Sequence, residues 1–262
     1  MNAGNVIAKT PEQIEGMQAS GRLLARALAL VMDEVEPGVT TSALNTVADE
    51  FIRDHGGTPS FLGVPAGSPG VAPFPGSICA SINDVIVHGI PSGNALQEGD
   101  IIGVDCGVIL DGWHSDSAVT VAVGEVDDEA ERLVAVTRDA LDAAVAAAQP
   151  GNRLGDVGAA VQGLVERAGF SVVRRFVGHG IGRAMHEPPQ VPNFGTVGTG
   201  AVLAVGTALA IEPMVNVGGP DVRFDADGWT ARSADGSLSA HFEHTVVVGA
   251  SGPIVLTNRA AS

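Results

Sequence analysis

A helix pair followed by a glycine occurs twice in this chain, and that repeat constrains the fold more than any other feature. The first copy predicts helices over 11–35 and 41–55 that end at Gly56. The second copy begins with a helix over 127–148 and ends at Gly169, which follows Gly56 by 113 residues. A Pro-Gly dipeptide separates the two helices in each copy, and five apolar positions coincide. Two unrelated amphipathic helices are the alternative, but the coincidences favour a duplicated fold.

Strand-like segments follow each copy of the helix pair. They span 77–88, 101–109 and 115–123 in the first half, and 171–176, 208–211 and 240–248 in the second. Strands between outer helices predict an α+β domain with internal pseudo-symmetry. We expect a tail at 1–10 and one domain over 11–262, with halves of about 11–123 and 124–250. Ligand sites in such folds often lie between the halves.

The charge balance limits the partners that the chain can bind. Thirty acidic residues stand against 14 basic ones, for a net charge of −16. A strongly acidic surface disfavours DNA and anionic membranes as partners. No apolar run approaches the roughly 18 residues of a membrane span, and the first ten residues lack the layout of a signal peptide. Since Cys79 and Cys106 do not make a disulfide framework, we expect a cytoplasmic protein, and a monomer.

Two aspartates point to a metal site on one predicted hairpin. Asp105 lies within an apolar strand, where an ionised carboxylate is costly unless something pairs with it. Asp111-Gly112 predicts a two-residue turn, which places Asp116 diagonally from Asp105 on the same face, roughly 7 Å away. Two carboxylates at that distance can hold two metal ions about 3.5–4 Å apart. The alternative is that Asp116 is a surface residue beside the turn.

Two glutamates follow the same reasoning. Glu212 ends an apolar strand, and Pro213 then stops the strand pairing. Glu243 lies in the middle of the strand predicted over 240–248, where a period of two places it on one face with His241. An acid in the middle of an apolar strand indicates a buried functional group rather than a surface charge.

Histidines supply the remaining candidate groups. His88 closes a strand, His179 lies between glycines, and His186 follows His179 by seven residues. The segment after His186 is not the zinc-binding HExxH helix, because Pro188 and Pro189 preclude a helix. Four acids and one histidine form a hard ligand set that suits pairs of Mn, Fe, Co or Zn ions and implies metal-assisted hydrolysis. The other histidines are interpreted as structural: His55, His114 and His244.

Together these segments resemble the type I methionine aminopeptidases of bacteria over nearly the whole chain. The matching segments are 9–15, 81–91, 105–116, 178–189, 211–214 and 242–245. The family has the pita-bread (creatinase/aminopeptidase-like) fold, in which two pseudo-symmetric halves combine central antiparallel β-structure with outer helices. The resemblance implies an enzyme that hydrolyses the initiator methionine from nascent proteins and peptides whose second residue is small. It also leaves open an association with the ribosome.

The resemblance further implies a role for each candidate residue. The five ligands of a dinuclear metal centre would be Asp105, Asp116, His179, Glu212 and Glu243. Asp116 and Glu243 would bridge the two ions, and Glu212 would also transfer the proton of the attacking water. His88 would meet the substrate near the scissile amide nitrogen. His186 would lie near the carbonyl oxygen or the following residue.

A methionine pocket and a second ion site complete the resemblance. The pocket residues it implies are Phe61, Phe74, Cys79, Met185 and Trp229, with Val64 nearby. A peripheral monovalent cation, Na or K, would bind at Asn83, Val85 and Ser239. This sequence departs from the family where Met185 replaces a phenylalanine and His241 replaces a glutamine, and the loop over 63–76 is longer. These departures concern the pocket rim rather than the catalytic set.

Two alternatives within the same fold compete with this interpretation. A proline-directed peptidase usually carries an additional N-terminal domain, for which 262 residues leave no room. A non-catalytic pita-bread binding protein would have lost metal ligands, whereas all five are present here. A metal-free hydrolase with paired carboxylates would leave His179 unexplained.

Overall fold

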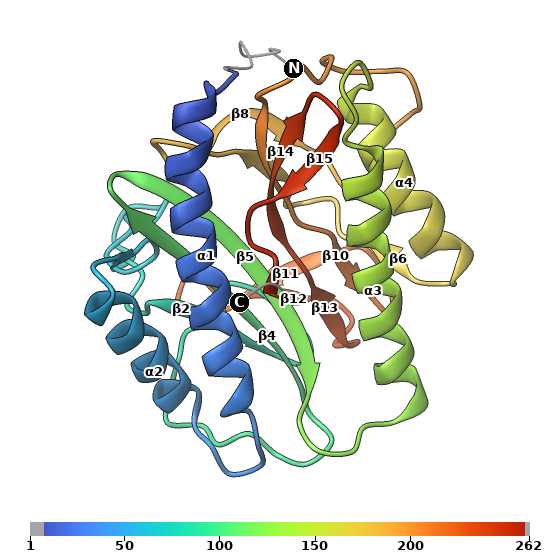
Figure 1. Ribbon diagram of the computed structural model, residues 1–262. Helices are drawn as coiled ribbons and strands as arrows, with labels where there is room; N and C mark the ends of the chain where they lie inside the picture. Colours follow the sequence, from blue (N-terminus) through green and yellow to red (C-terminus); the bar gives the residue numbers. More distant parts are fainter. Residues whose placement is uncertain (1–7, 260–262) are drawn as a thin grey trace.

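The computed structural model describes residues 8–259, in which two helix pairs pack against four antiparallel sheets (Figure 1). The first pair consists of α1 (Pro11–Asp33) and α2 (Thr41–Asp54). The second consists of α3 (Asp128–Ala147) and α4 (Leu154–Arg167), which lie at the right of the view in Figure 1, whereas the first pair lies at the left. The predicted α+β architecture with a repeated helix pair is therefore confirmed.

Side-chain caps define where the helices begin. Thr10 and Gln13 form a reciprocal capping box at the start of α1, with Pro11 in the first turn. Thr40 caps α2, and Asp127 caps α3 by accepting a hydrogen bond from the N–H of Ala130.

The two helix pairs also end alike. Gly56 follows α2 with φ of 77°, and Gly169 follows α4 with φ of 84°. Only glycine adopts this left-handed conformation without strain, so the two residues stop their helices for the same reason. The equivalence confirms the repeat at an offset of 113 residues that the sequence predicts.

The strands form one sheet of four, two of three and one of five. The four-stranded sheet contains β1 (Thr58–Pro59), β2 (Ile78–Ile82), β4 (Ile101–Leu110) and β5 (Trp113–Ala122). One three-stranded sheet contains β3 (Val85–Val87), β11 (Val222–Phe224) and β12 (Ala231–Ser233). The other contains β6 (Ser171–Val172), β10 (Met214–Asn216) and β13 (Ser239–His241). The five-stranded sheet contains β7 (Gly178–Gly180), β8 (Glu187–Val191), β9 (Ala208–Ile211), β14 (His244–Gly249) and β15 (Gly252–Val255).

Three predicted strands are shorter or interrupted. The strand expected over 77–88 is two strands, because Asn83 turns the chain with φ of 54° and β3 then pairs with the distant β12. The strand expected over 171–176 ends at Val172. The strand expected over 240–248 is wrong as a continuous element: β13 pairs with β10, whereas β14 pairs with β9.

The last interruption is matched by a break in the neighbouring strand. β9 and β10 are themselves separated by Glu212-Pro213, and β13 and β14 by Phe242-Glu243. His241 pairs with Met214 before the break, and His244 pairs with Ile211 after it. Both paired segments thus pass from the three-stranded sheet of β10 and β13 to the five-stranded sheet of β9 and β14 at the same point, which we call the joint. The two glutamates sit at this joint, outside regular pairing.

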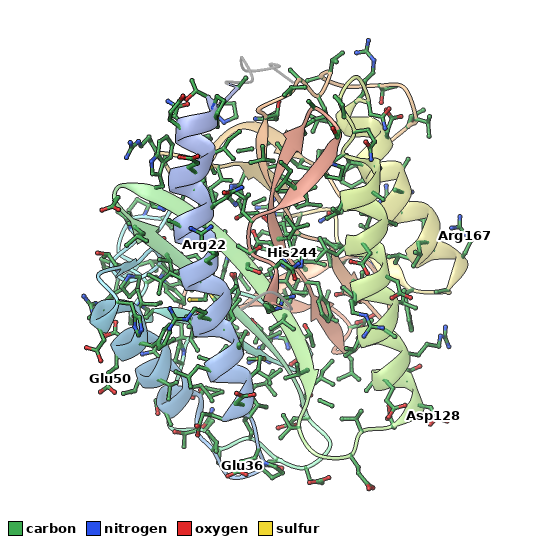
Figure 2. The ribbon with its side chains drawn as sticks, in the orientation of Figure 1. Arg22, Glu36, Glu50, Asp128, Arg167 and His244 are labelled. Atoms are coloured by element: carbon green, nitrogen blue, oxygen red, sulfur yellow. The ribbon has the colours of Figure 1, made fainter. Side chains whose placement is uncertain are left out.

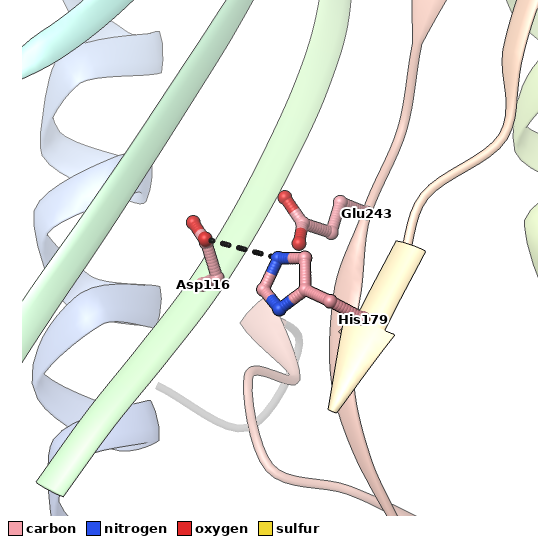
Figure 3. A group of neighbouring side chains, drawn as sticks. All are labelled: Asp116, His179 and Glu243. Atoms are coloured by element: carbon pink, nitrogen blue, oxygen red, sulfur yellow. Dashed lines mark ion pairs between the residues drawn. The ribbon is translucent and has the colours of Figure 1, made fainter. Parts of the chain in front are cut away.

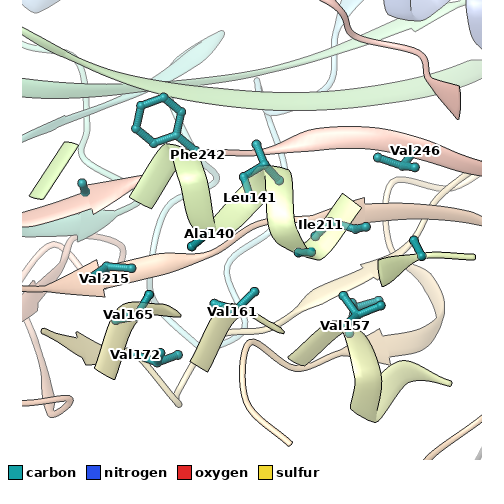
Figure 4. Packing of buried hydrophobic residues seen from close by; sticks show 14 of the residues in the cluster. Ala140, Leu141, Val157, Val161, Val165, Val172, Ile211, Val215, Phe242 and Val246 are labelled. Carbon is teal, nitrogen blue, oxygen red and sulfur yellow. The ribbon is translucent and has the colours of Figure 1, made fainter. Parts of the chain in front are cut away.

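Each helix pair covers its own apolar core. Leu44, Ala48 and Ile52 on α2 are fully buried, and Val157 and Val161 on α4 have the same environment. Figure 4 shows the second core, in which the α4 valines face side chains from α3 and the strands. Burying one side chain of this kind contributes about 1.5–3 kcal/mol, so the two cores hold the helices against the sheets.

The two halves meet where β5 lies beside the start of β14. The backbone of Ala118 exchanges hydrogen bonds with that of Glu243, at 3.0 and 3.4 Å between nitrogen and oxygen. Charged side chains lie on the outer helices, away from this joint; Figure 2 labels Glu50, Asp128 and Arg167. Across residues 8–259, no helix combines the length and the apolar composition that a membrane crossing requires.

Candidate metal centre

The predicted hairpin holds the first two carboxylates of the site. Asp111 and Gly112 have φ of 51° and 75°, as a type I′ turn requires, and the register pairs Gly107 with Asp116. Asp105 and Asp116 therefore lie diagonally on one face, and both line the same cavity. The interpretation of Asp116 as a surface residue is wrong, because only 4% of it is exposed.

The second half contributes a histidine and two glutamates. His179 lies on β7 opposite Ala210 of β9, so it stands next to the joint that carries Glu212 and Glu243. Nδ1 of His179 donates to the carbonyl oxygen of Gly180 at 2.9 Å. That bond leaves Nε2 with its lone pair toward the carboxylates, as metal-binding histidines require.

The ligand atoms are grouped, and His179 lies near two of the carboxylates without bonding to them. Atoms of Asp116, His179 and Glu243 lie within 4.8 Å of each other (Figure 3). Nε2 of His179 is 3.9 Å from Oδ2 of Asp116 and 3.7 Å from Oε1 of Glu212. These separations are too long for hydrogen bonds. They fit side chains that share an ion with bonds of about 2.0–2.2 Å.

Three of the buried carboxylate oxygens have no hydrogen-bond partner within the described residues. They are Oδ1 of Asp105, Oδ1 of Asp116 and Oε1 of Glu243. A buried, unpaired carboxylate is unfavourable by several kcal/mol unless it takes up a proton or binds a cation. The orphaned oxygens converge with the free nitrogen of His179, so the residues present fit a divalent metal centre.

Burial sets the protonation of the groups in the absence of an ion. It raises the pKa of Asp105 to about 7. It also raises the pKa values of Asp116, Glu212 and Glu243 well above their usual range, to which the neighbouring carboxylates add by repulsion. Burial lowers the pKa of His179 to about 4, so this histidine is neutral at physiological pH. A neutral histidine among protonated carboxyls can exchange the protons for metal.

A set of hydroxyl groups holds the metal-facing strands together. Thr245 Oγ1 accepts from the N–H of Asp116 at 2.9 Å and donates to its carbonyl at 2.8 Å. Ser117 Oγ donates to the carbonyl of Glu243 at 2.7 Å and accepts from Nη1 of Arg259 at 2.8 Å. Sequence reasoning missed these residues, because their contacts join strands more than 120 residues apart in the chain.

An apolar cavity opens directly on the carboxylates. Its apolar and sulfur-containing lining is Phe61, Val64, Phe74, Cys79, Met185 and Trp229. Its polar lining is His88, Asp105, Asp116, His179, His186, Glu212 and Glu243. The structure thus brings together every metal-binding, catalytic and pocket residue proposed from the sequence. Their individual roles remain predictions.

The two outer histidines line the same cavity and have different neighbours. The rings of His186 and His179 are 4.4 Å apart. His88 lies beyond the end of β3 with φ of 61°, and its ring is 6.3 Å from that of Trp229. Burial lowers the pKa of His88 to about 4 and lowers that of His186, so both are neutral near pH 7 and able to donate a hydrogen bond.

The expected cation residues and His241 are also near the joint. The N–H of Ser239 donates to the carbonyl of Asn83 at 2.8 Å. Val85 lies two residues after Asn83 in the chain. His241 is buried, and its Nε2 lies 3.7 Å from Oε2 of Glu212 without a hydrogen-bond partner among the described residues. Monovalent-ion binding by the first three residues stays a prediction.

The remaining histidines lie outside the cavity lining. His55 contacts the carbonyl of Phe51, His114 bonds to Ser60, and His244 bonds to Thr257.

A buried ion pair secures the loop that carries His186, and sequence reasoning missed it. Nζ of Lys9 is 2.6 Å from Oε2 of Glu187, with 6% and 17% of the two side chains exposed. Oε1 of Glu187 accepts from the N–H of Ala184 at 3.1 Å. The sequence feature that could have indicated this ion pair is that Lys9 is the only lysine of the chain. Of the tail expected at 1–10, residues 1–7 lie outside the described residues.

Comparisons with known proteins match nearly the whole chain. The model of metallopeptidase family M24 matches residues 15–250. The chain is 47% identical to the methionine aminopeptidase of Clostridium perfringens over 252 residues, covering 96% of this chain and 98% of the relative. It is 42% identical to the methionine aminopeptidase of Escherichia coli, covering 96% of this chain and 93% of the relative.

Solved structures give the same result for the fold. The crystal structure of methionine aminopeptidase from Rickettsia prowazekii superposes with a TM-score of 0.93 at 41% identity, covering 97% of this chain and 100% of that one. The Xaa-Pro dipeptidase from Bacillus anthracis superposes with a TM-score of 0.76 at 21% identity, and the match covers only 62% of it. The pita-bread fold expected from the sequence is confirmed.

Proposed function

The chain belongs to metallopeptidase family M24, and on this premise we propose that it is a metal-dependent methionyl aminopeptidase. Its substrates are nascent proteins and peptides whose initiator methionine precedes a small residue. One observation carries the proposal: a cavity with apolar side chains on one wall opens directly onto four carboxylates and a neutral histidine. Such a cavity positions a hydrophobic side chain beside a hydrolytic centre.

Five side chains would hold the metal. Asp105 would bind one ion, Asp116 and Glu243 would bridge, and His179 and Glu212 would bind the other. Two divalent ions held there would lower the pKa of bound water and polarise the scissile carbonyl. Co, Mn, Fe and Zn all suit this ligand set. The orphaned oxygens of Asp105, Asp116 and Glu243 support the assignment.

Three side chains would handle protons and the substrate backbone. Glu212, whose pKa is raised by burial, is suited to take a proton from the attacking water and return it to the leaving amine. His88 would donate to the scissile amide nitrogen. His186, 4.4 Å from the ring of His179, would donate near the carbonyl oxygen. Because both histidines are neutral, they donate without adding a positive charge beside the metal.

The pocket composition supports methionine as the residue removed. Phe74 and Cys79 are 3% and 4% exposed, and Met185 and Trp229 pack against them. Sulfur–aromatic contacts and a flexible wall suit an unbranched thioether. The restriction to a small second residue comes from the family resemblance.

The proposal also covers a second ion site, the oligomeric state and the location of the protein. We propose that a monovalent ion, Na or K, binds at Asn83, Val85 and Ser239. We also propose a monomer that acts in the cytoplasm, where nascent chains are available, and that can associate with the ribosome. The proline-directed alternative is disfavoured, because this chain is 21% identical to the Bacillus anthracis dipeptidase but 47% identical to the Clostridium perfringens methionine aminopeptidase.

Release of free methionine tests the proposal. Protein stripped with a chelator should release methionine from Met-Ala-Ser only after Mn(II) or Co(II) is added. Met-Leu-Ser should resist cleavage under the same conditions, because its second residue is large. Folded protein that cleaves neither peptide with any divalent metal would leave the non-catalytic binding protein as the better description.

A further inference from the structure

The aromatic rings around the cavity form a continuous row that leads to the molecular surface. Phe74 contacts Trp229 with ring centroids 5.2 Å apart, and Trp229 contacts His88 at 6.3 Å. His88 contacts Phe176 at 5.5 Å, and Phe176 contacts Phe224 at 6.1 Å. All four contacts are edge-on, with interplanar angles of 72–88°. Edge-on contacts are favourable for aromatic rings, so the row is a packed structure.

Exposure increases along this row. Phe74 at the inner end is 3% exposed, and Phe224 at the outer end is 49% exposed. Phe224 ends β11, whose sheet also contains β3, and β3 leads directly into His88. The outer rings are thus attached to the same sheet that positions a residue of the site. A peptide leaving the site at His88 would meet them.

A guanidinium group covers the outer end of the row. The Cζ of Arg175 lies 6.0 Å from the centre of the Phe224 ring. Arg175 is exposed, and no carboxylate of residues 8–259 lies within 4.0 Å of it in an ion pair. Its neighbour Arg174 differs, since it pairs with Glu166 at 3.6 Å and lies over Phe194. In a chain of net charge −16, Arg175 is a cation free to contact a ligand.

We propose that Phe176, Phe224 and Arg175 form a surface subsite for the part of the peptide that lies beyond the scissile bond. The proposal rests on the proposed function, in which methionine fills the cavity and His88 meets the amide nitrogen of the second residue. From His88 to Phe224 the path along the rings is about 12 Å, or three to four residues of extended chain. The subsite therefore takes the fourth or fifth residue of the substrate.

An aromatic side chain is the ligand that this subsite suits. It can pack edge-on against Phe224 and lie beneath the planar guanidinium of Arg175. The two contacts together should raise kcat/KM about three- to tenfold through a lower KM. A serine in the same place offers neither contact.

Three peptides and four variants test the subsite. The peptides are Met-Ala-Ser, Met-Ala-Ser-Phe-Phe-Ser and Met-Ala-Ser-Ser-Ser-Ser, assayed with the Mn(II)-loaded enzyme. The wild type should prefer the aromatic hexapeptide over the serine hexapeptide by about three- to tenfold. Phe224→Ala and Arg175→Gln should each reduce that preference toward one. Phe194→Ala and Arg174→Gln are the matched controls and should keep it, because the same arginine–phenylalanine pair lies elsewhere on the protein.

A binding measurement makes the subsite testable apart from cleavage. The product peptide Ala-Ser-Phe-Phe-Ser should bind the wild type more tightly than Ala-Ser-Ser-Ser-Ser in a calorimetric titration, and Phe224→Ala should abolish the difference. Equal binding of the two products, or an equal loss with Phe194→Ala, would overturn the proposal. If no peptide is cleaved, the proposed function fails, and the titration alone still decides whether the aromatic subsite exists.

Discussion

Chelator-treated protein should become less stable as the pH rises from 6.5 to 8. Burial raises the pKa of Asp105 to about 7, whereas an unfolded aspartate titrates near 3.8. Between these values the folded state binds a proton that the unfolded state has lost. The stability linked to this carboxyl is therefore complete at low pH and is lost as the pH rises through the folded pKa.

The buried histidines oppose part of this fall. Burial lowers the pKa of His88 and His179 to about 4 and that of His241 to about 3. Because an unfolded histidine titrates near 6.5, each of these groups gains about 0.4 kcal/mol of stability between pH 6.5 and 8, as does His244 with a folded pKa of about 3. The pKa values of both cysteines are raised well above 9.0, so the thiols stay protonated in the folded protein up to pH 8.

The size of the effect follows from the pKa of Asp105. Loss of its proton between pH 6.5 and 8 removes about 1 kcal/mol from the free energy of unfolding. For a chain of this size that corresponds to a fall in Tm of about 2–4 °C. Asp116, Glu212 and Glu243, whose pKa values are also raised well above their usual range, add to the fall and outweigh the gain from the histidines.

Thermal unfolding followed by circular dichroism measures the effect, with EDTA or with saturating Mn(II). Bound metal replaces the protons and binds more tightly at higher pH, so the Mn(II) samples should show no fall. Asp105→Asn should remove its own part of the fall in EDTA. A Tm in EDTA that is constant or rising from pH 6.5 to 8 would refute the reasoning, and an unchanged slope in Asp105→Asn would exclude Asp105 as its source.

Three other substitutions give separate predictions. Glu212→Gln should lower kcat for methionine release about 10²- to 10⁴-fold at saturating Mn(II), because the proton-transferring carboxyl is lost. Lys9→Met should lower the free energy of unfolding, measured in urea, by about 2–3 kcal/mol, because Glu187 stays partly buried without its partner. The double variant Lys9→Met, Glu187→Leu should recover part of that loss, because no unpaired charge remains. Gly180→Ala should cost about 1–3 kcal/mol in the same assay and weaken Mn(II) binding by calorimetry, because its Cβ would collide with the carbonyl oxygen of Pro188 beside His179. Wild-type stability in either of these last two proteins would contradict the packing described here.

Local rules account for the parts of the structure that the sequence predicts correctly. Asp111-Gly112 specifies its own turn, and the turn alone fixes the register that brings Asp105 and Asp116 onto one face. Thr10 and Gly56 likewise begin and end helices through contacts within a few residues. Where neighbouring residues decide the geometry, a single sequence is sufficient.

Long-range pairing decides the parts that were not predicted. The surroundings of Glu243 look like one strand in sequence, but the strand divides because its partner is also broken at Glu212. The pair of Lys9 and Glu187 joins residues 178 positions apart, and no local pattern marks it. The sequence does not indicate that Phe224 belongs to the aromatic row either, because β11 and β3 join one sheet only by pairing with β12 on either side.

Chemical labelling of Lys9 can report local unfolding at the start of α1, because Lys9 forms an ion pair there. Lys9 carries the only side-chain amine of the chain, and acylating reagents reach it only when it leaves Glu187. With 6% of that side chain exposed, labelling in the native protein requires local unfolding at the start of α1. The mass gained at Lys9 over time, read from a peptide digest, would therefore count openings of the segment that braces the His186 loop.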